Sequence, residues 1–188
     1  MILIMAETKR LDHSDFGPLF DENSRILILG SFPSVKSREQ KFYYGHPQNR
    51  FWKVLQILTD PALKEAVIRG DSVIPALPAL TVPQKKELAL KNRIALWDTI
   101  ESCVITGSSD SSIKDVVPND LSLILGQCDI RAIFCNGSAS YDLFMKTKDR
   151  QQVQSLPPVL KLPSTSPANA AWSLQRLAAA WDSITPYL

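Results

Sequence analysis

Four short apolar runs recur along the chain, and small or polar residues follow each run at once. They read RILILGSFPS (25–34), RIALWDTI (93–100), RAIFCNGSAS (131–140) and PVLKLPSTSP (158–167). The apolar residues are consecutive rather than alternating, which is typical of strands covered on both faces in a parallel sheet. The sequence therefore predicts four parallel β-strands.

Segments with helical spacing of their apolar residues lie between these runs. They cover residues 49–60, 61–69, 84–92, about 118–127 and 138–146. Alternation of strands and helices favours a layered α/β fold with right-handed crossovers. With 188 residues the chain is long enough for a substantial core, so we expect a single domain over residues 1–188.

The last predicted helix has the clearest start signal. Ser166 can cap it, Pro167 fits its first position, and apolar residues recur at near-helical spacing as far as Trp181. By contrast, the segment DSVIPALPALTVPQ (71–84) has three prolines and neither a helical nor an alternating pattern. This segment predicts a long ordered loop.

Polar and small residues follow every predicted strand, in the segments GSFPS, WDTI, NGSAS and PSTSP. In open parallel sheets, ligands bind in the crevice beyond the carboxyl ends of the strands. The four segments are therefore expected to meet at one edge of the sheet and to form one site.

Composition and charge point to a local rather than a global attraction for polyanions. The chain is 45% hydrophobic and has a formal charge of +2. The segment from Lys36 to Lys53, however, contains five Lys or Arg residues and one Glu. The same stretch holds many aromatic residues. Cations, small hydroxyls, backbone amides and aromatic rings together suit a phosphodiester with a stacked base.

Several other classes lack their signatures. Three cysteines without C-x-x-C spacing argue against a disulfide framework, a zinc knuckle or a four-cysteine iron–sulfur cluster. The apolar start is only six residues long and no window approaches the roughly 18 apolar residues of a membrane span, so we expect a cytoplasmic protein without a membrane partner. Walker and dinucleotide-binding motifs are absent from the sequence, so no nucleotide cofactor is indicated.

Three motifs together resemble a known family. GSFPS after the first strand, YYGHPQNRFW (43–52) and LPSTSPAN (162–169) look like the uracil-DNA glycosylase superfamily, and specifically its hypoxanthine-DNA (deoxyinosine) glycosylase branch. YYGHPQNRFW is the specific part, because ten residues with this many rare types rarely match by chance. The resemblance covers residues 24–181.

The resemblance implies a monofunctional DNA glycosylase, and a monomer is the default expectation for an enzyme that wraps one lesion. Such an enzyme flips a deaminated base, here hypoxanthine, out of DNA and hydrolyses its N-glycosidic bond to leave an abasic site. It needs no metal or other cofactor. The implied fold is a three-layer α/β/α sandwich with a central four-stranded parallel sheet, in agreement with the four predicted strands.

The resemblance also assigns roles to individual residues. In the hypoxanthine branch the asparagine of the HPxN element is catalytic, which here is Asn49, whose amide oxygen would orient the attacking water. Phe32 stands where other branches keep a polar water-activating side chain. Leu162 replaces the histidine of the uracil-specific branch, so strong excision of uracil from single strands is not expected.

Base binding is expected from Phe32, Tyr43, Tyr44 and Asp98. Tyr44 is the preferred stacking partner of the flipped base, and the Asp98 carboxylate would accept the N1 proton of hypoxanthine. The expected DNA contacts are Ser31, Ser34, Lys36, Arg38, Lys41, His46, Asn136, Ser138, Ser164, Thr165 and Ser166. The last three would form the loop that enters the minor groove.

Each of these residues also has an ordinary structural interpretation. Asn49 stands where a helix begins and can be its N-cap. Asp98 can be a turn residue, and Asn136 and Ser138 belong to an NGS sequence typical of turns. His46 can tie its loop to the sheet or contact a phosphate. The tyrosines can be core or rim aromatics, and the cations can be a solvated surface.

Three competing functions remain open from the sequence. A mismatch uracil or xanthine glycosylase differs only in the shape of its base pocket. A non-catalytic nucleic-acid-binding module would keep the fold and lose the chemistry. An esterase is the weakest alternative, because only His13 and His46 could serve as its base and no G-x-S-x-G elbow is present.

Overall fold

Four parallel strands form the central sheet of the protein, in the order β3-β2-β6-β7. The structure is a computed structural model that describes residues 8–13, 16–70, 76–106, 112–151 and 153–188. The strands are β2 (Ile26–Gly30), β3 (Ile94–Asp98), β6 (Ala132–Asn136) and β7 (Val159–Leu162). β2 pairs with β3 on one side and β6 on the other, and β6 pairs with β7. The four predicted strands are confirmed.

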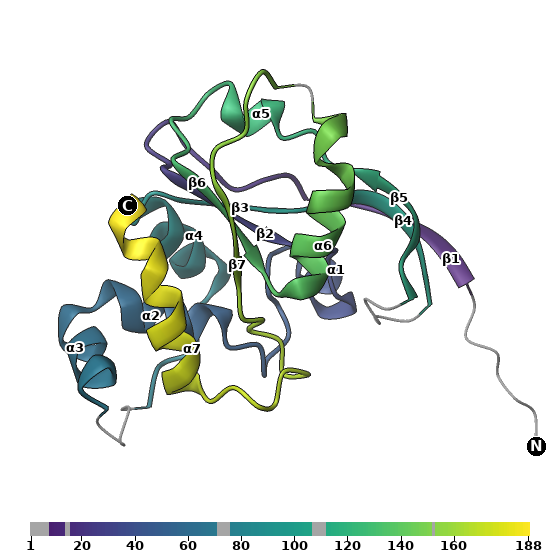
Figure 1. Cartoon of the computed structure of the whole chain (residues 1–188). Helices are drawn as coiled ribbons and strands as arrows, with labels where there is room; N and C mark the ends of the chain where they lie inside the picture. The colour runs from purple at the N-terminus through teal and green to yellow at the C-terminus, as the bar shows by residue number, and fades with distance from the viewer. Residues whose placement is uncertain (1–7, 14–15, 71–75, 107–111, 152) are drawn as a thin grey trace, which may run out of the picture.

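Helices cover both faces of this sheet. Figure 1 shows α2 (Phe51–Thr59), α4 (Val82–Lys91) and α7 (Leu174–Trp181) on one side of the sheet and α6 (Ser138–Thr147) on the other, with α3 (Pro61–Arg69) outside α2 and α7. α4 contacts β3, α6 contacts β6 and β7, and both α3 and α7 pack on α2. The predicted three-layer α/β/α sandwich is therefore confirmed.

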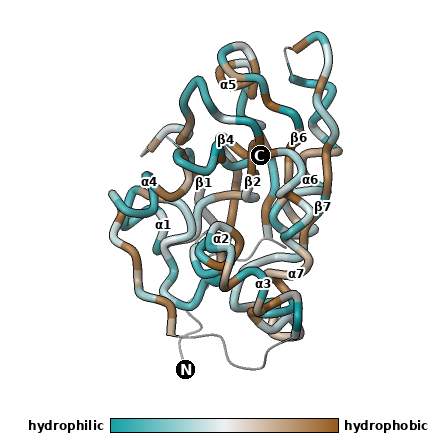
Figure 2. The backbone as a smooth tube through the Cα atoms, turned by 90° about the vertical axis from the view of Figure 1, so that its left-hand side faces the viewer, coloured by the Kyte–Doolittle hydropathy of each residue, from teal (hydrophilic) through white to brown (hydrophobic). Residues whose placement is uncertain are grey.

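The core runs from the sheet into the helical layer of α2 and α7. Residues 26–29 of β2 have no exposed surface, and Figure 2 shows β2 in the hydrophobic colour at the centre of the molecule. The rings of Phe51 in α2 and Trp181 in α7 are both fully buried and meet edge to face at 5.6 Å. Such an aromatic pair fixes the two helices against each other.

A second, antiparallel sheet was not predicted from the sequence. It consists of β1 (Thr8–Asp12), β4 (Ile100–Thr106) and β5 (Lys114–Pro118), in the order β1-β4-β5. Its strands carry many charged and polar residues, and β4 is buried on one side only, so they lack the continuous apolar runs of the central strands. β4 follows β3 after Thr99 alone, which places this sheet beside the carboxyl end of β3.

The last helix begins later than predicted. α7 starts at Leu174, and the hydroxyl of Ser173 caps it by accepting a hydrogen bond from the backbone N–H of Arg176 at 3.2 Å. Ser166 and Pro167 lie in a turn segment instead. The Arg50 guanidinium binds carbonyl groups of this segment.

Three smaller differences concern the other helices. The helix predicted at about 118–127 is the short α5 (Ser122–Leu125), because residues 114–118 belong to β5. α1 (Val35–Gln40) was not predicted, although Ser34 caps it through a 3.2 Å bond from the N–H of Ser37. Short 3₁₀ turns follow α6 and α7.

The proline-rich segment is only partly a loop. Residues 71–75 lie outside the described part of the chain, and residues 76–81 have no regular secondary structure. α4 then begins at Val82, two positions earlier than predicted, because Thr81 and Gln84 form a reciprocal capping box.

Candidate active site

Residues from the ends of all four parallel strands enclose one cavity of about 150 Å³. Residues 30–34 follow β2, Asp98 ends β3, Asn136 ends β6, and residues 164–166 follow β7. Residues of the segment before α2 complete the wall. A cavity of this size class can hold a ring-sized ligand. The four segments that follow the strands therefore meet at one site, as the sequence predicted.

Eleven of the sixteen residues predicted for the site line this cavity. They are Ser31, Phe32, Ser34, Tyr43, Tyr44, Asn49, Asp98, Asn136, Ser164, Thr165 and Ser166. The structure adds Gly30, Pro33, Ser37 and Ile105 to the wall. The other five predicted residues, Lys36, Arg38, Lys41, His46 and Ser138, do not line it.

Asn49 is joined to the loop after β7 through Thr165. The Oδ1 atom of Asn49 accepts hydrogen bonds from the backbone N–H of Phe51 at 3.0 Å and from the hydroxyl of Thr165 at 2.9 Å. The Nδ2 group of Asn136 donates to the same Thr165 hydroxyl at 2.9 Å. Among the described residues, none accepts a hydrogen bond from the Nδ2 group of Asn49. The amide oxygen thus acts at the helix start, and the amide nitrogen stays available to a ligand.

Arg50 holds the loop between β7 and α7 in place. Its guanidinium donates to the carbonyl oxygens of Ser166 at 2.5 Å, Asn169 at 3.1 Å and Thr165 at 3.3 Å, and also to that of Trp172. The backbone N–H of Arg50 donates to the carbonyl of Thr165 at 3.1 Å. Arg50 therefore binds carbonyl groups of the protein itself. We call these hydrogen bonds from Arg50 to the loop the clamp.

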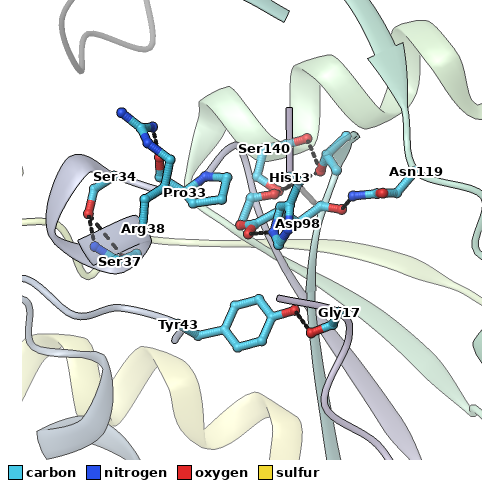
Figure 3. Close-up of polar contacts among 12 residues, drawn as sticks. His13, Gly17, Pro33, Ser34, Ser37, Arg38, Tyr43, Asp98, Asn119 and Ser140 are labelled. Atoms are coloured by element: carbon cyan, nitrogen blue, oxygen red, sulfur yellow. Dashed lines mark hydrogen bonds and ion pairs between the residues drawn. The ribbon is translucent and has the colours of Figure 1, made fainter. Parts of the chain in front are cut away.

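Asp98 forms a buried ion pair with His13, shown in Figure 3. The Nε2 atom of His13 lies 2.6 Å from Oδ2 of Asp98, and both side chains are buried. Burial lowers the pKa of the imidazole, but the hydrogen bond and the charge of Asp98 outweigh it, so the pKa of His13 is raised. The carbonyl of Asp98 accepts a further bond from Asn119 Nδ2 at 2.9 Å. His13 therefore holds the carboxylate of Asp98, and Asn119 holds its backbone carbonyl.

Tyr44 lines the cavity close to Gly30, the last residue of β2. Its ring stacks on that of Phe51 at 3.9 Å between centroids, and its backbone adopts a left-handed conformation with φ of 52°. Burial and the charge of Asp98 raise the pKa of its hydroxyl, against a weaker opposing contact with Asn136. Left-handed backbone is uncommon for a bulky residue and marks a constrained, often functional position.

Tyr43 and Phe32 contribute to the wall while packing into the protein. The Tyr43 hydroxyl donates to the carbonyl of Gly17 at 2.8 Å, as Figure 3 shows, and the residue is 2% exposed. Phe32 is 8% exposed and packs on Ile100 and Cys103 of the second sheet. Both side chains are therefore fixed before any ligand enters.

The remaining predicted cations lie on α1 beside the cavity. Lys36 pairs with Glu39 at 2.7 Å, and the guanidinium of Arg38 donates to the carbonyl of Pro33 at 2.6 Å. Lys41 ends α1 in a left-handed conformation and is exposed. These cations therefore lie outside the lining of the cavity.

His46 and Ser138 border two neighbouring hollows. His46 Nδ1 accepts a hydrogen bond from the N–H of Gln48 at 3.2 Å, and its side chain lines a hollow against residues 78–82. Ser138, the first residue of α6, lines a third hollow together with Asn136, Ser164 and Ser166. Both residues therefore lie next to the cavity without entering it.

Gly30, His13 and Arg50 were not assigned to the site from the sequence. A methyl group on Gly30 would lie 2.1 Å from Asp98 Oδ1, so only glycine permits the close approach of this carboxylate. The one sequence signal for Gly30 was its place directly after an apolar run. His13 is 85 positions away from Asp98, and nothing in its neighbourhood marks it.

The described part of the chain has no group of three or more His, Cys, Asp or Glu side chains suited to a metal ion. Within that same part, none of the helices is both long and apolar enough to cross a membrane.

Fold and cavity together define an α/β protein that can hold a flat polar ring beyond the carboxyl ends of its parallel strands. The family model described as "Uracil DNA glycosylase superfamily" matches residues 18–185, which is most of the chain. The chain belongs to the uracil DNA glycosylase superfamily.

Individual relatives agree with this membership. A hypoxanthine DNA glycosylase of Methanosarcina acetivorans is 30% identical over 172 residues, covering 90% of this chain and 95% of that protein. A hypoxanthine DNA glycosylase of Methanosarcina barkeri is 32% identical over 126 residues, covering 66% and 71%. A solution NMR structure of a proposed uracil DNA glycosylase from M. acetivorans has a TM-score of 0.65 at 27% identity, over 90% of this chain and 96% of the other. The resemblance inferred from the motifs is confirmed.

Proposed function

We propose that the protein is a monofunctional DNA glycosylase that removes hypoxanthine from deoxyinosine in DNA. The observation that carries the proposal is the cavity in which Asn49, Tyr44 and Asp98 meet at the carboxyl edge of the sheet. Membership of the superfamily supplies the reaction class and DNA as substrate. The names of the two relatives favour hypoxanthine as the base.

The proposed reaction is the hydrolysis of one bond. The bond between C1′ of deoxyribose and N9 of the base breaks, the electron pair leaves with the base, and the sugar passes through an oxocarbenium-like state. A water molecule adds its hydroxyl to C1′, and its proton goes to the departing base or to solvent. The products are free hypoxanthine and an abasic site.

Asn49 is the proposed water-positioning residue. Its Oδ1 atom is taken by the N–H of Phe51 and the hydroxyl of Thr165, and these two bonds fix the plane of the amide. The Nδ2 group can then donate to the oxygen of a water molecule and hold it against C1′. The amide oxygen, which the resemblance assigned to the water, is already occupied by these two donors, so the amide nitrogen takes that role in the proposal. Holding the water in the position for attack raises the reaction rate without a strong base.

Tyr44 is the proposed stacking partner of the flipped base. Its ring is already held by Phe51 and needs no rearrangement to receive a second ring. Tyr43 and Phe32 form the rigid wall behind the base, since both are almost fully buried. A pocket fixed in advance lowers the entropy cost of binding a flipped base.

The loop of Ser164, Thr165 and Ser166 is the proposed wedge that keeps the duplex open. Ser164 and Ser166 are its proposed contact residues, because Thr165 is fully buried and its hydroxyl is bonded to Asn49 and Asn136. Arg50 binds the carbonyls on this loop and makes it rigid enough for that task. The phosphates that flank the flipped nucleotide are proposed to contact Ser31, Ser34, Asn136 and Ser138. The phosphates of the neighbouring duplex are proposed to contact Lys36, Arg38, Lys41 and His46. A monomeric state and a cytoplasmic location remain predictions.

The test is incubation with end-labelled duplexes that contain inosine, xanthine, uracil or mismatched thymine, followed by alkaline cleavage of abasic sites. We expect cleavage of the inosine duplex to be fastest. Faster cleavage of the uracil or xanthine duplex would replace hypoxanthine as the substrate within the same reaction class. Binding to the duplexes without cleavage of any of them would instead show a binding module.

A further inference from the structure

A second hollow, of about 360 Å³, lies directly beside the cavity. It is lined by residues of the segment 40–56 on one side and of the segment 78–85 on the other, and we call it the side hollow. Tyr44 and Asn49 line both the cavity and the side hollow, so the two spaces share one wall. A polymer chain that leaves the cavity past this wall enters the side hollow.

The side hollow is lined by cations that have no counter-ion among the described residues. Lys53 of α2 and Lys85 of α4 lie on its two sides, and His46 also lines it. None of its described lining residues is Asp or Glu. Within the described part of the chain, the lysines that form ion pairs are Lys36 and Lys64. The positive charge of the side hollow therefore favours an anionic ligand.

Lys85 is half-buried over an aromatic ring. Its ammonium nitrogen lies 5.6 Å from the centroid of the Trp52 ring. Burial lowers the pKa of this amine, because a low-dielectric environment disfavours the charged form. An anion bound beside Lys85 would offset this cost.

The remaining lining of the side hollow is largely apolar. Pro47, Pro78, Leu80 and Val82 line it together with Trp52. Apolar side chains beside unpaired cations suit a nucleotide, since the base and sugar can contact the apolar groups while a phosphate binds the cations.

Both sides of the side hollow are held together by the protein itself. Gln56 Nε2 donates a hydrogen bond to the carbonyl oxygen of Pro78 at 3.3 Å, which joins α2 to the stretch before α4. The capping box of Thr81 and Gln84 fixes the start of α4, the helix that carries Lys85. The fold therefore forms the side hollow before any ligand binds.

We propose that the side hollow binds the nucleotide next to the flipped one on the damaged strand, and that Lys53 and Lys85 bind its phosphate. The inference rests on the proposed function, in which Asn49 lies beside C1′ of the flipped nucleotide. The backbone joined to that sugar has to leave the cavity, and the wall of Tyr44 and Asn49 leads into the side hollow. These two lysines thus contact the damaged strand close to the lesion.

The first test replaces single phosphates of a duplex that contains an abasic site with uncharged methylphosphonates. One series places the replacement on either side of the abasic site in the damaged strand, and a second series places it in the complementary strand. For one position beside the abasic site, the affinity of wild type should fall about 5-fold or more. The same replacement should cost the Lys53→Gln/Lys85→Gln variant less than about twofold, because the charge that it removes has no partner there. A loss of affinity from the complementary strand alone would overturn the assignment to the damaged strand.

The second test measures the salt dependence of binding by the same double variant. Glutamine keeps much of the side-chain stem over Trp52 and removes the charge. The double variant should bind the abasic duplex about 10-fold or more weakly at low salt, and the slope of log K against log salt should fall by about 2. An unchanged slope and affinity would overturn the proposal.

Lys91→Gln is the matched control for charge. Lys91 is exposed at the other end of α4, beside the start of β3, and lies outside the lining of the cavity and of the side hollow. Its replacement should leave the slope nearly unchanged. Thermal unfolding checks that the variants keep the stability of wild type.

A third measurement uses wild type alone and so does not depend on the folding of a variant. Limited acetylation of the lysines is followed by mass spectrometry, with and without the abasic duplex. DNA should protect Lys53 and Lys85 and leave Lys91 accessible. Equal acetylation of Lys85 in the presence and absence of DNA would overturn the proposed contact.

The outcomes separate this inference from the proposed function. If wild type neither releases a base nor binds the abasic duplex, both are overturned. If wild type releases hypoxanthine while the double variant binds and excises within about threefold of it, the role of the side hollow is overturned and the glycosylase stands. If DNA protects both lysines while no base is released, the contact with DNA stands and the glycosylase is overturned.

Discussion

Replacing Arg50 with methionine should loosen the loop that carries Ser164 to Ser166. The guanidinium donates to four carbonyl groups of this loop, those of Thr165, Ser166, Asn169 and Trp172. Methionine keeps the apolar stem of the side chain and removes every one of these donors. The variant therefore removes the hydrogen bonds to the loop and preserves the packing of the side-chain stem before α2.

The size of the effect follows from these bonds. A hydrogen bond with one charged partner contributes about 1.5–3 kcal/mol to stability when its loss leaves the other group buried and unpaired. Arg50 is half-buried, so water can replace some of the lost donors. We therefore expect a loss of about 2–4 kcal/mol rather than the sum of four bonds, or roughly 5–15 °C in Tm for a chain of this size.

Urea unfolding followed by tryptophan fluorescence measures this loss. Arg69→Met is the matched control, because Arg69 lies on the surface of α3 and, among the described residues, pairs with Glu65 across one helical turn. Such exposed pairs contribute about 0–1 kcal/mol. An Arg50→Met variant as stable as the Arg69→Met control would refute the clamp. A loss of stability with unchanged excision would show that the wedge role of the loop is wrong.

Three further outcomes test other parts of the structure. Gly30→Ala places a methyl group 2.1 Å from Asp98 Oδ1, so urea unfolding should show a loss of about 1–3 kcal/mol in the free energy of unfolding. The excision rate should also fall strongly, and a normal rate would contradict the cavity assignment. The pKa of His13 is raised in the folded state, so its pairing stabilises the protein below the ordinary pKa of 6.5 and this stabilisation is lost as the pH rises through the folded-state pKa. The difference in unfolding free energy between wild type and His13→Gln should therefore be largest below pH 6.5 and shrink as the pH rises above it. Replacing Lys36 and Lys41 together with alanine should reduce the slope of log K for DNA against log salt by about 2, and an unchanged slope would exclude both from phosphate contact.

The strands and the site edge were predictable because both depend on local patterns. Ile26 to Leu29 form an unbroken apolar run that only a doubly covered strand explains, and the structure leaves none of them exposed. Parallel strands place all their carboxyl ends at one edge, so segments such as GSFPS and PSTSP had to meet. Most of the predicted site residues line the cavity for this reason.

The pairing of His13 with Asp98 was not predictable from local patterns. β1 reads TKRLD and has no apolar run, since it joins a sheet that is buried on one side. Its position depends on cross-strand register with β4, a contact between residues about ninety positions apart. The same holds for Arg50, which a charge count places on a solvated surface and which binds carbonyls of residues 165–172 instead.

The start of α7 shows how tertiary contacts can override a good capping signal. Ser166 followed by Pro167 is a strong helix start in isolation. In the structure the carbonyl of Ser166 is bound by Arg50, and its N–H is bound by the Ser164 hydroxyl at 3.2 Å. Both backbone groups are thus already satisfied outside a helix, and Ser173 takes over the cap.

The most direct test of the central claim is single-turnover excision of hypoxanthine from an inosine duplex by wild type and by Asn49→Ala. The claim is that Asn49 positions the attacking water, so the rate should fall about 100-fold or more while affinity for an abasic duplex stays within about threefold. Asn23→Ala, an exposed asparagine before β2 at the opposite end of the sheet, is the matched control. Excision by Asn49→Ala within about threefold of wild type would contradict the account and assign the water to another group.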